Sequence, residues 1–230
     1  MSRPRIIKSN RNRNWRASSL SRGVRDYPAV DYTLRPTQQF LNNASLMKLG
    51  AHMPTAGGVW KAIEHGRRLG CEAIQLFVKN NKQWRAPILS SQTVSQFLAH
   101  RTALPGTAVF GHTGYLINLA APPSPNRGRS IESLAQEIEI ASLLRLPFLV
   151  MHPGAHLGQG ERTGLANVIA GLNEVLNATQ RSDVRLALEN TAGQGTSIGH
   201  DIAHLAAIFD RVACPARLGL CLDTAHFFAA

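Results

Sequence analysis

From residue 47 to the end of the chain, short apolar runs alternate with segments of helical period. This alternation is typical of βα units arranged around a parallel sheet, since each strand then needs a helix to return the chain to the same edge. It therefore predicts an α/β protein with six strands, at residues 48–52, 73–78, 108–112, 147–152, 185–189 and 217–223.

Three of the intervening segments carry the spacing of an amphipathic helix. The clearest lies between the fourth and fifth predicted strands, and the others precede the fourth strand and the sixth. The apolar positions are Leu165, Val168, Ile169, Leu172, Val175 and Leu176; Ile131, Leu134 and Ile138; and Ile202, Leu205, Phe209 and Val212.

Periodicity alone does not separate an open, doubly wound sheet from a closed (β/α)8 barrel. The predicted strands end in residues that bind ligands or form hydrogen bonds, namely His52, Lys79-Asn80, His112, His152, Glu189-Asn190 and Asp223. A barrel brings these ends together around one mouth, so we favour the (β/α)8 TIM-barrel class. Such a barrel typically needs about 250 residues, which is more than remains after residue 46.

Residues 1–46 lack this periodicity and hold nine basic residues against two acidic ones, which is +7 of the chain's net +11. We predict that they form a disordered basic extension to a domain spanning residues 47–230. Three interpretations stay open for this segment. The segment is a nucleic-acid-binding arm, or it is a mitochondrial-type targeting segment. In the third interpretation the natural protein begins at Met47, and residues 1–46 come from a start placed upstream of it.

Other features of the sequence exclude several classes of protein. The longest apolar stretch, around residues 140–151, is interrupted by Arg145 and Pro147, so no membrane span is predicted. The three cysteines are odd in number and have no C-x-x-C spacing. Neither a disulfide framework nor a cysteine-based zinc site is indicated, and we expect a reducing, cytoplasmic setting.

Five residues are candidate metal ligands: His112, His152, Glu189, Asp223 and His226. A single histidine at a strand end is more often a hydrogen-bonded structural residue than a ligand. Together, however, the five offer only imidazole and carboxylate, a set suited to zinc or manganese. We therefore predict a metal site at the mouth.

Several motifs, in one order, make residues 47–230 resemble the endonuclease IV family of zinc-dependent apurinic/apyrimidinic (AP) endonucleases. The matching segments are Gly50-Ala51-His52, Ala56-Gly57-Gly58, the run Phe77-Val78-Lys79-Asn80-Asn81-Lys82-Gln83-Trp84, the run from His112 to Ala120, His152-Pro153-Gly154-Ala155-His156, the run from Glu189 to Gly195, and Cys221-Leu222-Asp223-Thr224-Ala225-His226-Phe227. Residues 1–46 have no part in this resemblance.

The resemblance implies a barrel with three zinc ions that hydrolyses duplex DNA 5′ to abasic sites by a zinc-activated hydroxide, leaving a 3′-hydroxyl and a 5′-deoxyribose phosphate. It implies that His112 and His152 bind the first zinc, that catalytic Glu189 bridges to the second, which Asp223 also binds, and that His226 binds the third. It also implies DNA contacts by a second set, Asn81, Lys82, Gln83, Trp84, Tyr115 and Leu116. A monomer in the bacterial cytosol or nucleoid is expected.

The chain stops at Ala230, shortly after the sixth predicted strand, and the family pattern has further strands and ligands after this point. We therefore expect a fragment with an open barrel and at most partly bound zinc. Two alternatives stay open. One is an inactive remnant that still binds DNA, and the other is a metal-dependent sugar isomerase of the same barrel fold.

Overall fold

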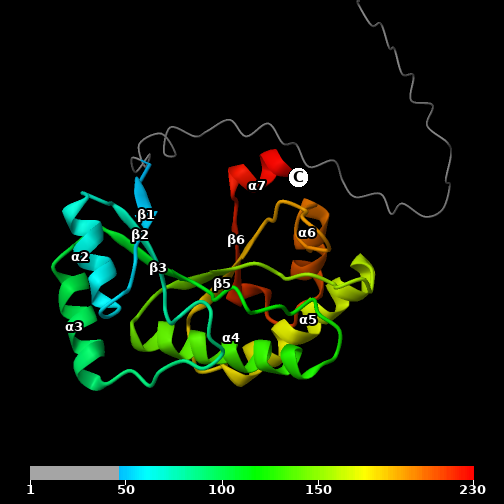
Figure 1. Cartoon of the computed structure of the whole chain (residues 1–230), viewed down its shortest axis with the longest axis horizontal. Helices are drawn as coiled ribbons and strands as arrows, with labels where there is room; N and C mark the ends of the chain where they lie inside the picture. The colour runs from blue at the N-terminus through cyan, green and yellow to red at the C-terminus, as the bar shows by residue number, and fades with distance from the viewer. Residues whose placement is uncertain (1–46) are drawn as a thin grey trace, which may run out of the picture. The chain divides into compact units, whose positions relative to one another are not determined.

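The computed structural model describes residues 47–230, which fold into six parallel strands alternating with helices (Figure 1). The strands are β1 (Gly50–His52), β2 (Ala73–Phe77), β3 (Ala108–His112), β4 (Phe148–Met151), β5 (Arg185–Glu189) and β6 (Leu218–Cys221). Each pairs with its neighbours in chain order, so the sheet runs β1-β2-β3-β4-β5-β6. The extension predicted at residues 1–46 lies outside the described residues.

Every connection between strands includes a helix. These are α2 (Trp60–Arg68), α3 (Ser91–Thr102), α4 (Pro125–Leu143), α5 (Glu161–Ala178) and α6 (Ile202–Arg211), with a 3-10 turn η1 (Pro215–Arg217) before β6 and a short α7 (Thr224–Ala229) after it. Side-chain caps set the start of several helices. Ser90 accepts a hydrogen bond from the Thr93 N–H at α3, and Ser124 accepts one from the Arg127 N–H at α4.

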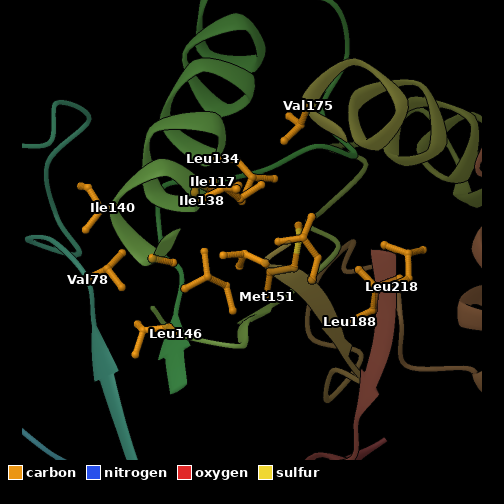
Figure 2. Packing of buried hydrophobic residues seen from close by; sticks show 14 of the residues in the cluster. Val78, Ile117, Leu134, Ile138, Ile140, Leu146, Met151, Val175, Leu188 and Leu218 are labelled. Carbon is orange, nitrogen blue, oxygen red and sulfur yellow. The ribbon is translucent and has the colours of Figure 1, made fainter. Parts of the chain in front are cut away.

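The central strands are apolar along their length because both of their faces are covered, as is usual in a parallel sheet. In β5, Leu186, Ala187 and Leu188 are all buried. Figure 2 shows Leu134 and Ile138 of α4 and Val175 of α5 lying over Met151 of β4 and Leu188 of β5. This apolar packing fixes the strands whose ends carry the candidate ligands.

The predicted fold class is confirmed, including the open sheet of six strands. The bounds predicted for β3 and β5 are those observed, and the other strands are one to three residues shorter than predicted. In the described residues β1 and β6 pair on one side only, and Leu220 of β6 is 54% exposed. No helix between residues 47 and 230 has both the length and the apolar character of a membrane span.

Helix α4 ends in a left-handed residue that is not glycine. Arg145 has φ 54°, and the Leu146 N–H after it donates to the Ala141 carbonyl at 2.8 Å, closing the last turn. Glycine is the residue that adopts this conformation without a steric cost. The Arg145 charge also lies near Arg101, whose pKa is lowered by burial and by this neighbour.

We expect Arg145→Gly to raise the free energy of unfolding by about 0.5–1 kcal/mol, because relief of the left-handed strain outweighs the extra flexibility of the unfolded chain. Arg145→Ala is the matched control, since it removes the same charge but keeps the Cβ. Guanidinium denaturation of the three chains measures the difference. Equal stability of the Gly and Ala variants would show that charge, not backbone strain, dominates at this position.

Candidate metal centre and its surrounding loops

The carboxyl ends of the parallel strands bring the five predicted ligands to one edge of the sheet. His112 ends β3, His152 directly follows β4, Glu189 ends β5, and Asp223 and His226 follow β6. Register explains the approach, since β5 lies between β4 and β6 and pairs Leu188 with Met151 and Glu189 with Cys221. The strand order therefore gives Glu189 a ligand-bearing neighbour on each side.

The first cluster consists of His112, His152 and Glu189. The Nε2 atoms of both histidines lie 3.2 Å from the same Glu189 oxygen, Oε2, and the glutamate side chain is only 9% exposed. Burial alone would raise the pKa of Glu189, but the contacts with His112 and His152 outweigh it and lower the pKa to about 2. The carboxylate is thus ionised while the imidazoles hold a proton toward it, and a cation can take the place of that proton.

The orientation of His112 favours a metal ion at this cluster. Its Nδ1–H donates to the Thr113 carbonyl at 2.8 Å, so in the neutral ring Nε2 carries a lone pair that points at the Glu189 carboxylate. Two lone pairs facing each other need either a proton or a cation between them. Ligand atoms of a tetrahedral zinc lie about 3.3 Å apart, close to the observed separation, so these residues fit the metal.

A second cluster is formed by Glu189, Asp223 and His226, whose ligand atoms lie within 4.8 Å of one another. His226 Nδ1 lies 3.6 Å from Glu189 Oε1 and 3.7 Å from Asp223 Oδ2, and it donates to the Asn190 carbonyl at 2.8 Å. Asp223 also caps α7, because its Oδ1 accepts the His226 N–H. All five predicted metal ligands are thus brought together, and Glu189 belongs to both clusters.

Two asparagines, Asn190 buried and Asn118 half-buried, hold the loops that carry these residues. Asn190 uses both ends of its side-chain amide on Asp223, accepting from its N–H at 2.6 Å and donating to its carbonyl at 3.0 Å. Asn118 makes the same two bonds to Ala155, accepting from its N–H at 2.9 Å and donating to its carbonyl at 3.0 Å. Ala155 lies in the loop that begins at His152. Both asparagines lie in the motifs noted in the sequence, but this positioning role was not predicted.

The residues predicted to contact DNA lie in the loops after β2 and β3, beside the metal clusters. The Tyr115 N–H donates to the Asn81 carbonyl at 3.1 Å and so joins the two loops. Tyr115 is 63% exposed and Leu116 36%, whereas Trp84 is half-buried, and Lys82 and Gln83 are exposed. The structure shows where these six residues lie, and their contact with DNA remains a prediction.

A polar hollow of about 220 Å³ opens between these loops and the clusters. Its lining includes Tyr115, Asn118, His152, Thr191 and His226. A group of modest size can therefore lie between the exposed tyrosine and the histidines of both clusters.

Sequence reasoning missed a buried ion pair beneath these loops. Lys79 Nζ lies 3.3 Å from Glu137 Oε1 of α4, and both side chains are almost fully buried. The same carboxylate accepts the Gly114 N–H at 3.0 Å, and Lys79 Nζ also donates to the Gln83 carbonyl. Burial raises the pKa of Glu137, while Lys79 and the Gly114 N–H oppose that rise. The one available signal was an acidic residue between Leu134 and Ile138 on the apolar face of the helix.

Two other polar residues at this edge stay outside the clusters. His52 ends β1 and bonds the Gln75 side chain at 2.9 Å instead. Burial raises the pKa of Cys221 to about 11, and the negative charges of Glu189 and Asp223 contribute to this rise. The thiol therefore stays protonated at neutral pH, which does not favour a cysteine nucleophile there.

A family model described as "Xylose isomerase-like TIM barrel" matches residues 63–230. The chain belongs to this family. Curated relatives include the "Probable endonuclease 4" of Chloroflexus aggregans, 42% identical over 183 residues, and that of Geobacter sulfurreducens, 43% identical over 182 residues. These relatives confirm the resemblance to the endonuclease IV family.

Solved structures agree with this assignment. The crystal structure of endonuclease IV from Thermus thermophilus superposes with a TM-score of 0.69 at 33% identity, covering 80% of this chain and 65% of that one. A D-psicose 3-epimerase superposes with a TM-score of 0.63 at 14% identity, which shows the shared fold alone. The alignments with the two curated relatives cover 80% and 79% of this chain but only 64% and 62% of their own lengths.

We expect loss of one member of the Lys79–Glu137 pair to leave a buried, uncompensated charge. Glu137→Gln and Lys79→Met should each lower the free energy of unfolding by about 3–5 kcal/mol. The double variant should cost clearly less than the sum, because the introduced amide can still accept the Gly114 N–H and no charge remains. Denaturant unfolding of the four chains measures the coupling, and strictly additive losses would argue against a buried charged pair.

We expect Glu189→Gln to weaken zinc binding more than loss of any single histidine, because Glu189 is the one residue shared by both clusters. The amide keeps the size of the side chain but removes its charge. Isothermal titration with Zn²⁺ should show at least one tightly bound equivalent fewer. Glu64→Gln, which alters a glutamate paired with Lys61 and His100, is the control. An unchanged stoichiometry in the Glu189 variant would remove this cluster as a metal site.

Proposed function

We propose that this chain is a DNA-repair endonuclease that hydrolyses the phosphodiester 5′ to abasic sites in duplex DNA, leaving a 3′-hydroxyl and a 5′-deoxyribose phosphate. The activity depends on zinc and belongs to base excision repair. Supporting this proposal are the endonuclease 4 relatives and one structural observation. Two imidazole nitrogens face the same buried oxygen of Glu189, whose other oxygen faces His226.

In this proposal His112, His152, Glu189, Asp223 and His226 hold the zinc ions. Bound zinc lowers the pKa of water and neutralises negative charge on a phosphodiester. Glu189 is the central group because its carboxylate stays ionised at neutral pH and faces ligands on both sides. The carbonyl of Thr113 keeps the proton of His112 on Nδ1, which leaves Nε2 free for the cation.

The two neighbouring loops provide the DNA contacts. Tyr115 and Leu116 present exposed apolar surface beside the clusters, which suits insertion into a groove at a position without a base. An abasic nucleotide has already lost its stacking, so turning it out of the duplex costs little. Lys82, on the loop joined to Tyr115 through Asn81, adds positive charge for the phosphate backbone.

The remaining features of the proposal follow from this role. Residues 47–230 are the barrel unit that acts on DNA, residues 1–46 are a basic extension, and the protein works as a monomer in the cytoplasm. The exposed mouth loops are the surface for duplex DNA. The chain spans less than two thirds of the length of these two relatives.

The proposal predicts cleavage of a duplex with one tetrahydrofuran abasic analogue when the chain is incubated with zinc. The product should end at the 5′ side of the lesion, and a chelator should abolish the reaction. Glu189→Gln should lower the rate by at least about 100-fold. His100→Gln, which alters a histidine paired with Glu64, should leave it unchanged. Denaturing gel electrophoresis of end-labelled DNA measures all four reactions.

Two outcomes would contradict the proposal. A folded, zinc-loaded chain that binds the abasic duplex without cutting it would be the inactive, DNA-binding alternative. A chain that neither binds nor cleaves DNA but interconverts ketose sugars would support the sugar-isomerase alternative. The epimerase structure shares the fold with this chain. Intact duplex in parallel reactions separates damage recognition from general nuclease activity.

A further inference from the structure

A third group of metal-binding side chains lies outside the two clusters at the mouth and shares no residue with them. It consists of Glu161, His200 and His204, whose ligand atoms lie within 4.8 Å of one another. His200 Nε2 lies 3.4 Å from Glu161 Oε1, and His204 Nε2 lies 3.4 Å from Glu161 Oε2. These separations match the spacing of about 3.3 Å between ligands of a tetrahedral zinc.

The three side chains are positioned by the starts of two helices. Glu161 is the first residue of α5, while His200 and His204 stand on either side of Asp201, the N-cap of α6. His200 lies in the loop just before the N-cap, whereas His204 lies in the first turn of α6, so the start of the helix brings the two imidazoles together. Their rings meet edge to face with centroids 4.8 Å apart.

The hydrogen bonds of His200 repeat those of His112 in the first cluster. Its Nδ1–H donates to the Ser197 carbonyl at 2.9 Å, so in the neutral ring the lone pair of Nε2 points at the Glu161 carboxylate. The contact is also longer than the roughly 2.7–2.9 Å of a charge-assisted hydrogen bond. A cation between the two groups satisfies both of them.

We propose that Glu161, His200 and His204 form a separate site for a divalent transition-metal cation, with Zn²⁺ as the probe. Two imidazoles and one carboxylate suit zinc, and they do not suit magnesium or calcium, which prefer oxygen ligands. Glu161 is 53% exposed, so water can complete the coordination. His204 Nδ1 accepts the Gly199 N–H at 3.3 Å, so the neutral ring carries its proton on Nε2, which faces Glu161. A cation bound at Nε2 moves that proton to Nδ1 and breaks the long contact with Gly199.

The site fastens two loops that border the mouth. The loop after β4 and the loop after β5 already touch through the bridge between Ala155 and Ser197. Backbone hydrogen bonds from His156 N to Thr196 O and from Ile198 N to Gly154 O join them further. Both loops line the hollow beside His152, so a cation that ties Glu161 to His200 and His204 rigidifies one wall of the mouth.

The test separates this site from the mouth clusters by working in a Glu189→Gln background. Zinc binding is measured by isothermal titration and by Co²⁺ absorption in the Glu189→Gln chain and in the same chain carrying Glu161→Gln or His200→Gln. Glu174→Gln, at an exposed position of the same helix α5, is the matched control. Glu161 is exposed, so its replacement by glutamine leaves the packing of the helix intact.

The Glu189→Gln chain should bind one equivalent of zinc. Glu161→Gln and His200→Gln should weaken that binding at least tenfold, whereas Glu174→Gln should leave it unchanged. In the otherwise unaltered chain, Glu161→Gln alone should lower the number of bound zinc equivalents by one. No zinc binding in the Glu189→Gln chain, or equal binding in all of these variants, would mean that the group is only a hydrogen-bonded cluster.

Hydrogen exchange tests the fastening role without measuring activity. Zinc should slow amide exchange in residues 154–160 and 194–201 of the Glu189→Gln chain, and Glu161→Gln should abolish this protection. Zinc binding without protection of either segment would overturn the loop-fastening role. Because the readouts are binding and exchange, they can fail or succeed independently of DNA cleavage.

Discussion

The mouth of this protein depends on one buried carboxylate. Glu189 ends β5 with its side chain 9% exposed, and a charge in that position is stable only with compensating partners. The order of the sheet supplies them, because β4 on one side carries His152 and β6 on the other leads to Asp223 and His226. The candidate ligand set thus depends on strand order, since a different neighbour for β5 would take His152 or His226 away from the carboxylate and leave His112, which comes from β3.

The loops at this edge are held by buried and half-buried polar side chains that satisfy the backbone of a neighbouring segment. Asn190 does so for Asp223, Asn118 for Ala155, and the Glu137 carboxylate for Gly114. Loop backbone that is withdrawn from water needs such partners, because an unpaired N–H or carbonyl is costly there. The same contacts that offset this cost also aim the loops at the mouth.

The sequence predicted those parts of the fold that follow from apolar patterns. The bounds of β3 and β5 were predicted correctly, and α4, α5 and α6 showed helical periodicity. Helix α3 was not predicted because it buries only Phe97, so its apolar period is weak. Four of the five candidate ligands followed from the strand ends and His226 from its place three residues after Asp223, with their roles implied by the family motifs. Glu137 and the Glu161 group depend on packing between distant segments, which local spacing does not reveal.

The two halves of the candidate metal centre differ in how firmly the fold supports them. His112, His152 and Glu189 come from strands that pair on both sides, so their backbones are fixed before any ion arrives. Asp223 and His226 follow β6, which pairs only with β5 among the described strands, and no residue of α7 is buried. What holds this second half in place is the pair of hydrogen bonds from Asn190 to Asp223 and the bond from His226 to the Asn190 carbonyl. The first cluster is therefore the preorganised part of the centre, and the second is the part whose geometry depends on a single asparagine.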